Sequence, residues 1–479
     1  MLIWTQVVNQ FRIFKNLIWL NPQRNLILII TSGLILSPIT YIAAKEVVNK
    51  IYTGINKKNA VLVNEKAIEQ TENSLPAISS DIATDTTNNQ QTPGTSNKTS
   101  NTSSRSSSNG SGSSSSSSGS SSGSSGVDNG SSSSLPSCES NYSFFTTSPL
   151  NESDYTSITP LGNLNPSGHV FPTDHIYFYL TNYLSSYNLY SPGDATVIQI
   201  SASEHVTDGF TDYTFTFQPC NEFKAQFGHV SALADKLSQA LSAPYQWDST
   251  YSTGGKTYRN YGKNVSLTIT AGEQIGTVGG NAGQMALDMN AYDSRITLNF
   301  ANLSRWSQRS DTTHTVCPIN YYSSDLKTTL TNRFGDYDGN PKRTVDPICG
   351  TIEQDVAGTT QGNWFVAGTT TFSSEDPHLA LVHDNIDPAQ AVFSVGTSMS
   401  ASGLSSGTYQ FSPQSSGLVN RDFDDITSDG NAYCFEPNYL SGKIIMQLTN
   451  SVTLKIEKQA DSCGSGPWNF TSAATDFER

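Results

Sequence analysis

The sequence predicts a mainly β protein tethered to a membrane, with a transmembrane helix and a disordered linker ahead of two β domains. Three observations predict this fold class. Near the N-terminus, 19 consecutive residues carry no charge and are mostly apolar. A tract dominated by serine and glycine follows. Beyond residue 140, short runs of β-branched and aromatic residues are separated by turn residues, which is typical of strands in antiparallel sheets.

The uncharged run covers residues 26–44 and is expected to form a single-pass transmembrane helix. At about 1.5 Å per residue it just spans a bilayer core of about 30 Å. No small-residue cleavage site follows, so we expect an uncleaved anchor. Residues 1–25 would then be a cytoplasmic or interfacial segment, and residues 45–72 a juxtamembrane segment. Lysines and arginines flank the run on both sides, so charge does not fix its orientation.

Residues 73–140 are predicted to be a disordered linker. Apolar residues become scarce here, and residues 111–126 are almost pure serine and glycine. Such a composition cannot bury enough apolar surface to offset the entropy of ordering the chain. The linker is therefore expected to hold the folded body away from the membrane.

Charge and cysteine content indicate an extracytoplasmic body that does not bind nucleic acid. The net charge is −14 and no basic patch stands out, so phosphate would be repelled. All six cysteines lie after residue 137, and no two form a C-x-x-C pair. This pattern predicts disulfides and an oxidising compartment. We expect Cys317 to pair with Cys349 and Cys434 with Cys463, because each pair closes a short local loop.

Residues 141–312 are predicted to form the first β domain, an antiparallel sandwich with one short helix. Strands are expected at residues 175–180, 195–200 and 213–217, where β-branched and aromatic residues gather. Apolar residues at helical spacing predict the helix within residues 230–241.

The segment GHVFPTDH at residues 168–175 is the clearest sign of a site in this domain. It brings His169, Asp174 and His175 into seven residues. Imidazole nitrogen and carboxylate oxygen are zinc ligands, provided that a third ligand arrives from elsewhere in the chain.

Three blocks carry a family resemblance: GH at 168–169 through Asp174 to LYSPGDATV at 189–197, FGHVS at 227–231, and AGEQIGTVGG at 271–280. In this order they resemble the β core of the lysostaphin/LytM-type zinc peptidases, whose duplicated hybrid motif fold cleaves peptidoglycan cross-links. The resemblance covers roughly residues 160–300. It implies that the first domain is a β-sandwich of the lysostaphin/LytM type.

The resemblance also implies roles for individual residues. His169 and Asp174 would be ligands of a zinc ion, and His229 would be a catalytic histidine beside it. The family takes its third ligand and second catalytic histidine from a His-x-His that follows the glycine-rich hairpin. This chain has Ala286 and Asp288 at those two positions. Asp288 is expected to be the third ligand through its carboxylate.

Two departures from the family pattern imply impaired catalysis. Alanine at position 286 cannot move a proton, and losing a positioned acid–base group costs on the order of a hundred- to ten-thousand-fold in rate. Four residues separate His169 from Asp174, where the family has three. Whether His175 or His229 compensates stays open. A further alternative is that these side chains only hydrogen-bond one another as remnants of the fold.

Residues 313–479 are predicted to form a second all-β domain, which resembles no family that we recognise. Strands are expected at residues 363–366, 379–382, 391–395, 443–448 and 452–456. His378 and His383 are an odd number of residues apart, so they should face opposite sides of a strand. We expect them at the surface or at the edge of the core, without a shared metal.

The first functional hypothesis is a membrane-anchored, extracytoplasmic protein of the cell envelope that binds or scaffolds, with a degenerate peptidase-like domain that can hold zinc. Its partners would be the membrane and a cell-wall peptide or glycan. One alternative is a zinc-dependent endopeptidase acting on cell-wall peptides, with Asp288 as third ligand. Another is a surface adhesin or glycan-binding protein that acts through the second β domain.

Overall fold

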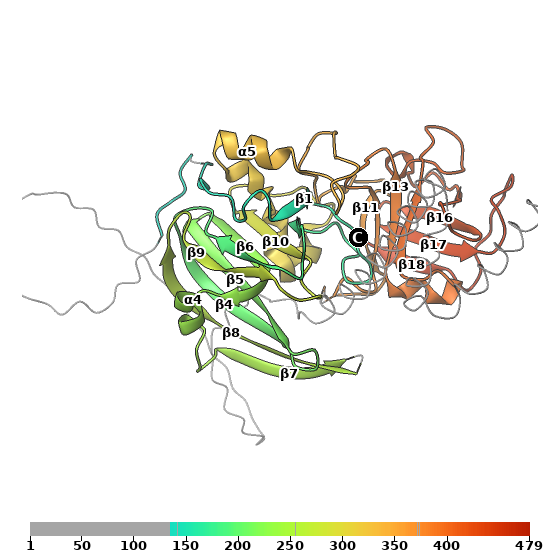
Figure 1. Cartoon of the computed structure of the whole chain (residues 1–479). Helices are drawn as coiled ribbons and strands as arrows, with labels where there is room; N and C mark the ends of the chain where they lie inside the picture. The colour runs from blue at the N-terminus through green and yellow to red at the C-terminus, as the bar shows by residue number, and fades with distance from the viewer. Residues whose placement is uncertain (1–134, 141, 254, 371, 373) are drawn as a thin grey trace, which may run out of the picture. The chain divides into compact units, whose positions relative to one another are not determined.

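The computed structural model describes residues 135–479, except residues 141, 254, 371 and 373. The predicted transmembrane helix and nearly all of the predicted linker lie outside the described residues. Among the residues that are described, none belongs to a helix long and apolar enough to cross a membrane. The described chain is mainly β, and all pairings between its named strands are antiparallel, which confirms that part of the predicted fold class (Figure 1).

The first sheet contains ten strands from the N-terminal half of the described chain. Eight follow one path in the order β1-β2-β10-β6-β5-β4-β8-β7, while β9 pairs with both β3 and β6. The short helix α4 (Asp235–Ala240) lies between β6 and β7. The strands are β1 (Tyr155–Thr159), β2 (His175–Leu180), β3 (Ser186–Tyr190), β4 (Ala195–His205), β5 (Phe210–Cys220), β6 (Phe223–Leu233), β7 (Trp247–Thr253), β8 (Lys256–Ile269), β9 (Gln274–Gly279) and β10 (Ala286–Asp293).

Alternation of apolar and polar residues explains why the central strands of this sheet bury one face. In β10, Leu287, Met289 and Ala291 are fully buried, whereas the residues between them point to the other face. On the neighbouring strands Phe215 and Phe227 pack with ring centroids 5.8 Å apart. Each fully buried aliphatic or aromatic side chain of this kind stabilises the fold by about 1.5–3 kcal/mol.

The helix predicted within residues 230–241 is correct only in its second half. Residues 230–233 belong to strand β6, because Val230 pairs with Val278 of β9 and Leu233 with Gly276. The helix α4 then buries Leu237 alone among its six residues. Pairing with a neighbouring strand thus overrides the local helical spacing.

Residues 303–352 add two 3-10 helices and one α-helix to the core of the first sheet. These are η2 (Leu303–His314), η3 (Pro318–Tyr321) and α5 (Ser324–Thr331). Tyr321 and Tyr322 join the same buried cluster as Phe145 and Phe223. The domain boundary predicted between residues 312 and 313 stays a prediction.

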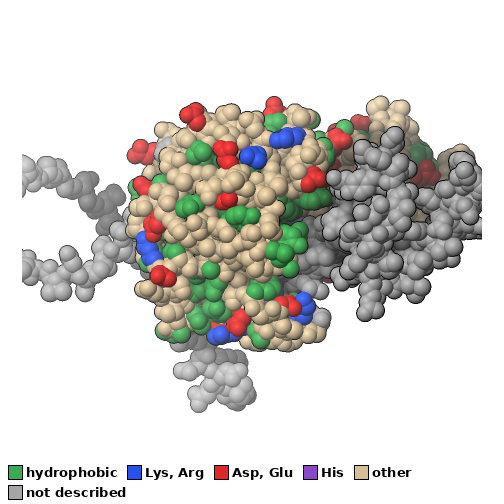
Figure 2. All heavy atoms as spheres, viewed as in Figure 1, with side chains coloured by type: hydrophobic (Ala, Val, Ile, Leu, Met, Phe, Trp, Pro, Cys, Tyr) green, Lys and Arg blue, Asp and Glu red, His purple; other side chains and the backbone are tan. Residues whose placement is uncertain are grey.

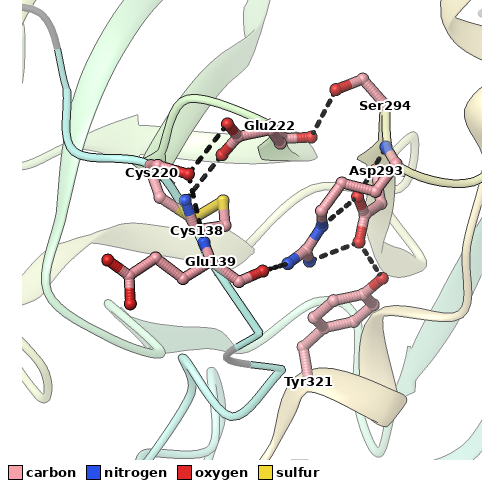
Figure 3. The surroundings of a disulfide bond; sticks show 9 residues. Cys138, Glu139, Cys220, Glu222, Asp293, Ser294 and Tyr321 are labelled. Carbon is pink, nitrogen blue, oxygen red and sulfur yellow. Dashed lines mark hydrogen bonds and ion pairs between the residues drawn. A yellow bond between two sulfur atoms is a disulfide. The ribbon is translucent and has the colours of Figure 1, made fainter.

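Three disulfides cross-link the described chain. Cys317–Cys349 and Cys434–Cys463 confirm the two predicted pairs. The third, Cys138–Cys220, joins the start of the described chain to the end of β5 (Figure 3).

Polar contacts fix the chain around this third disulfide. Glu222 accepts a hydrogen bond from the backbone N–H of Cys138 at 2.6 Å. The nearby Arg295 donates to Asp293, with an Nη2–Oδ2 separation of 2.6 Å, and to the backbone oxygen of Glu139 (Figure 3). The entry of the chain into the sheet is therefore held covalently and by charged hydrogen bonds.

The second sheet contains eight strands in the order β14-β13-β12-β11-β18-β17-β16-β15. Short 3-10 helices η4 (Thr397–Ser402) and η5 (Phe423–Asp425) lie between some of them. The strands are β11 (Gly362–Val366), β12 (Leu379–His383), β13 (Ala391–Val395), β14 (Gly407–Phe411), β15 (Tyr433–Phe435), β16 (Lys443–Asn450), β17 (Thr453–Gln459) and β18 (Thr475–Glu478).

The second sheet curls around its own core and also contributes to the core of the first sheet. Phe411 of β14 and Phe435 of β15, the two edge strands, have ring centroids 5.2 Å apart. In β12, Leu379 and Leu381 face this inner core, while Ala380 and Val382 face the core shared with the first sheet. Residues 313–479 are therefore mainly β. Their strands lie between residues 362 and 478, whereas η3 and α5 lie within residues 318–331.

The two histidines at the ends of β12 face opposite sides, as predicted. His383 bonds Asp422 on one side, with Nε2 and Oδ1 3.0 Å apart. His378 lies on the other side and is only 1% exposed, so its predicted position at the surface or core edge is wrong. Its ring stacks on Phe171, which belongs to the loop before β2. The ring packs among Phe171, Phe365 and Phe372, and its Nδ1 accepts a hydrogen bond from the backbone N–H of Val366 at 3.2 Å.

The surface agrees with the low charge content of the sequence. Figure 2 shows that on this face acidic and basic side chains are scattered, some of them beside one another, with small apolar areas between them and no large patch of either charge. This face offers no extended basic patch for a polyanion.

Candidate functional site

Four neighbouring strands gather the candidate residues on one face of the first sheet. The strands β2, β10, β6 and β5 are adjacent in that order. Register places His175 opposite Asn290, and Asp288 opposite Gly228. Side chains two residues apart on a strand share a face, so Asp288 and Asn290 point away from the buried Leu287.

A bulge in β6 turns His229 toward the same face. Between two paired positions β5 advances two residues, Tyr213 to Phe215, while β6 advances three, Phe227 to Val230. The extra residue is accommodated at His229, whose φ is +57°. Left-handed φ values are uncommon for residues with a side chain, and bulges of this kind re-aim side chains next to functional sites.

Gly228 lies beside the carboxylate of Asp288, at a distance that leaves room for no more than van der Waals contact with a small side chain. A side-chain carbon there would lie 3.4 Å from Cβ and 3.7 Å from Oδ2 of Asp288. The carboxylate of Asp288 therefore lies directly over the backbone of Gly228, and the bulged His229 can approach it from the side.

Asp174 is held by donors from three elements. Its Oδ1 accepts from Asn290 Nδ2 at 3.0 Å and lies 3.2 Å from His175 Nδ1. Its Oδ2 accepts from the Tyr292 hydroxyl at 3.0 Å and from Thr312 Oγ1 at 3.5 Å. Burial alone would raise the pKa of Asp174, but the hydrogen bond and charge of His175, with the Tyr292 hydroxyl and the charge of His169, hold it at about 2.

Two carboxylate–imidazole pairs converge on a third carboxylate. Asp174 contacts Nδ1 of His175, and Asp212 Oδ2 lies 2.6 Å from Nδ1 of His229. The other nitrogen of each ring, Nε2, faces Oδ2 of Asp288, at 3.5 Å from His175 and 3.3 Å from His229. Each imidazole is thus oriented at one nitrogen and presents the other to the same oxygen.

His169 lies at the outer edge of this cluster. Its ring contacts that of His175 edge to face, with centroids 5.4 Å apart, and it is half-buried. Its charge also stabilises the ionised form of Asp174. His169 reaches the cluster through a loop that begins before β2, not from the sheet itself.

All four residues predicted for the site therefore lie in one connected cluster. His229 and Asp288 are in direct contact, Asp174 is linked to them through His175, and His169 lies against His175. Their predicted roles as metal ligands and catalytic histidine stay predictions. Both oxygens of Asp174 are engaged by protein donors, so this arrangement favours an orienting role over direct ligation.

Sequence reasoning did not assign a role to His175 and did not identify Asp212 at all. The position of His175 directly after Asp174 was a usable signal, because its side chain lies opposite Asn290 on the site face. Asp212 carries no such signal. Its contact with His229 depends on the bulge, which no local pattern in the sequence reveals.

The donor atoms fit zinc, although they are not gathered into a complete metal site. Ligands at about 2.0–2.1 Å from a tetrahedral zinc ion lie about 3.3 Å from one another. The two Nε2–Oδ2 separations of 3.3 and 3.5 Å match that edge. Across residues 135–479, apart from the four positions left undescribed, no group of three His, Cys, Asp or Glu side chains already has the geometry to hold a metal ion.

One buried nitrogen in the cluster lacks a hydrogen bond within the described part of the chain. His175 is only 8% exposed, and its Nε2 makes no hydrogen bond although it faces Asp288. Leaving a buried polar atom unsatisfied costs about 1–3 kcal/mol, so such atoms usually have a function. A lone pair on this nitrogen could bind a cation.

Ala286 occupies one of the two positions at which the sequence resemblance predicts a histidine. It shares the site face with Asp288, two residues away on β10, and pairs with Tyr179 of β2. No proton-transferring group reaches the cluster from this position, so the imidazoles come from β2, β6 and the loop before β2.

A scan against models of protein families gave no match, and a search of curated proteins gave none either.

Proposed function

We propose that the chain is a zinc-dependent hydrolase that acts on peptides of the cell envelope, tethered by residues 26–44 with its β body outside the cytoplasm. One observation carries the proposal: two imidazoles, each oriented by an aspartate, present Nε2 to the same oxygen of Asp288. Aspartate-oriented histidines beside a carboxylate are the usual surroundings of a catalytic zinc ion. The three disulfides support a location outside the cytoplasm.

The proposed zinc ligands are His175, His229 and Asp288. A bound zinc ion would act as a Lewis acid and lower the pKa of its water to about 7. Asp174 and Asp212 would keep a proton on Nδ1 of each ring, so that the lone pair of Nε2 points inward. This assignment moves Asp174 from ligand to orienting residue, because its oxygens already accept bonds from Asn290 and Tyr292.

His175 can supply the imidazole that is missing at position 286. The family takes its imidazole from the strand that here is β10, whereas this chain can supply one from β2, across the pair that those strands form. His169, half-buried and in ring contact with His175, is then the imidazole left to exchange a proton with the leaving amine.

A second candidate function is peptide binding without hydrolysis. The specific observation in its favour is that Ala286 lies on the site face beside Asp288 and supplies no acid or base. The same zinc centre would then fix a peptide carboxylate or carbonyl in a scaffolding protein. Zinc binding is common to both candidates, and hydrolysis separates them.

Zinc binding tests the proposal first. We expect one zinc ion per chain by inductively coupled plasma mass spectrometry, and its loss in Asp288→Ala and in His229→Ala. His383→Ala is the matched control, because its imidazole is also paired with an aspartate and both side chains are 20% exposed. Asp212→Asn, which removes only an orienting group, should weaken zinc binding about 10- to 100-fold. Wild-type protein without zinc, or a control variant that loses it equally, would contradict the zinc site.

Hydrolysis tests the second step. Purified peptidoglycan peptides incubated with the zinc-loaded chain should be cleaved, and His169→Ala should lower the rate by about a hundredfold or more while zinc stays bound. Stoichiometric zinc with binding of the same peptides and no cleavage would favour the scaffolding function.

A further inference from the structure

The loop that carries His169 and Asp174 is anchored in the C-terminal half of the chain. Phe171, between these two residues, is 2% exposed. Its ring centroid lies 5.3 Å from that of Phe365 in β11 and 5.4 Å from that of Phe372. The His378 ring stacks on it at 5.7 Å, with only 6° between the planes.

A buried carboxylate from the C-terminal half fixes the backbone at the same point. Glu375 is 9% exposed, and its Oε2 accepts the backbone N–H of Phe171 at 3.0 Å. Its other oxygen accepts from Arg309 Nη1 at 2.7 Å, and this arginine lies over the Phe372 ring at 4.5 Å. A buried charge that is paired and hydrogen-bonded on both oxygens defines a single position, because any other would leave it unsatisfied.

Phe171 is close enough in sequence to His169 and Asp174 for its position to determine theirs. Phe171 is two residues from His169 and three from Asp174. Since only two residues lie between Phe171 and Asp174, a displacement of Phe171 shifts the backbone that leads directly to Asp174. Asp174 in turn contacts Nδ1 of His175, whose Nε2 faces Asp288. A 1 Å misplacement of such groups is enough to weaken a site strongly.

We propose that the C-terminal half of the chain holds the site in place. Glu375 and the Phe171 ring that packs against this half act as positioning residues. They position the loop that carries His169, Asp174 and His175. The metal-binding consequence rests on the zinc site proposed above, whereas the positioning itself does not. In this view residues 313–479 are not an independent binding module joined to a separate peptidase-like domain.

Paired variants of the full chain test this inference. Glu375→Gln removes the buried carboxylate of the segment between β11 and β12, and Glu457→Gln, in β17 of the second sheet, is its control. Glu457 is also buried, at 2% exposure, and also accepts two bonds, from the N–H and hydroxyl of Thr471. Phe171→Leu and its control Phe411→Leu form a second pair, which replaces the first if Glu375→Gln fails to fold.

Two readouts separate positioning from general destabilisation. The first is the rate at which diethyl pyrocarbonate modifies His169 and His175, followed by peptide mass spectrometry with His383 as internal reference. We expect a several-fold faster modification in Glu375→Gln and Phe171→Leu than in controls with an equal loss of Tm. The second is zinc affinity by chelator competition, which should fall about tenfold in these two variants alone.

The outcomes distinguish the two proposals. If the histidines are modified faster in Glu375→Gln and Phe171→Leu, but the wild-type protein binds no zinc, the positioning role stands and the zinc site is ruled out. Unchanged modification in Glu375→Gln and Phe171→Leu, or an equal increase in the two controls, would overturn the positioning role whatever the zinc result.

Discussion

At the scale of single residues, the histidine that stacks on Phe171 makes the fold sensitive to acid. His378 is almost fully buried, and its Nδ1 accepts the backbone N–H of Val366 at 3.2 Å. Burial, together with the nearby charges of Arg305 and Arg309, lowers the pKa of His378 to about 4. Between about pH 4 and pH 6.5, His378 is therefore mostly neutral in the folded protein and mostly protonated in the unfolded chain.

We predict that this single group weakens the fold between pH 6.5 and pH 4. Its folded pKa lies below its unfolded value of about 6.5, so the unfolded state gains a proton first as the pH falls. The contribution to the free energy of unfolding is then full above about pH 6.5 and falls by about 3 kcal/mol by pH 4. Urea denaturation of the wild type and of His378→Asn at several pH values measures this difference.

His378→Asn retains an acceptor near the position of Nδ1 and removes the titrating ring. Its stability should therefore be lower at neutral pH but should depend less on pH than that of the wild type. A variant with an unchanged pH slope would show that other groups cause the acid sensitivity.

At the scale of elements, the bulge in β6 forces the backbone of His229 into a left-handed conformation. Its φ of +57° is unfavourable for any residue with a Cβ, and it persists here with Nδ1 2.6 Å from Asp212 and Nε2 3.3 Å from Asp288. Strain of this kind is typical of functional positions, where surrounding contacts over-determine the backbone.

Two substitutions of His229 separate the strain from the imidazole contacts. Both His229→Ala and His229→Gly remove the ring, but only glycine adopts a positive φ without a steric cost. We expect His229→Gly to be more stable than His229→Ala by about 1 kcal/mol in the free energy of unfolding. Gln226, three residues earlier in the same strand and paired in register with Asn290 and Thr216, is the control. There the order should reverse, because glycine in a regular strand is destabilising. Equal stability of the two His229 variants would remove the argument for strain.

The same element shows how far the sequence predicts the site. Periodicity predicted β2 at residues 175–180 and β13 at 391–395, because both strands bury nearly every side chain and read as apolar runs. It failed at residues 230–233, where strand pairing with β9 decides the conformation. The bulge was invisible for a related reason: it is defined by the register between two strands, and it alone brings Asp212 to His229.

At the scale of the whole molecule, a disulfide that closes a longer loop should contribute more to stability, with the logarithm of the loop length. Cys138–Cys220 spans 82 residues and Cys434–Cys463 spans 29. Loop entropy gives about 4.5 kcal/mol for the first and about 3.6 kcal/mol for the second. We predict that the double serine variant of Cys138 and Cys220 loses more stability than that of Cys434 and Cys463, as measured by guanidinium denaturation. The reverse order would indicate that native packing rather than chain entropy dominates.

The contact between the N-terminal and C-terminal halves of the described chain could not be predicted from the sequence. Local patterns separated a first and a second β domain and placed the candidate site wholly in the first. The contact between Phe171 and Glu375 joins residues 204 positions apart, and nothing in either segment signals the other. Apolar residues predict that a side chain is buried, but not which distant element buries it.

The disulfide at the entry of the body has a mechanical consequence for a tethered protein. A pull on the chain from its N-terminal side reaches Cys138 and passes through the sulfur bridge to Cys220, at the end of β5 in the middle of the sheet. Residues 139–219 lie inside the covalent loop and bear no tension while the bridge is intact. The loop with His169 and Asp174 is part of that stretch, so a pull through the proposed tether would bypass it along the covalent chain, and reduction of this one bond would place it in the line of force.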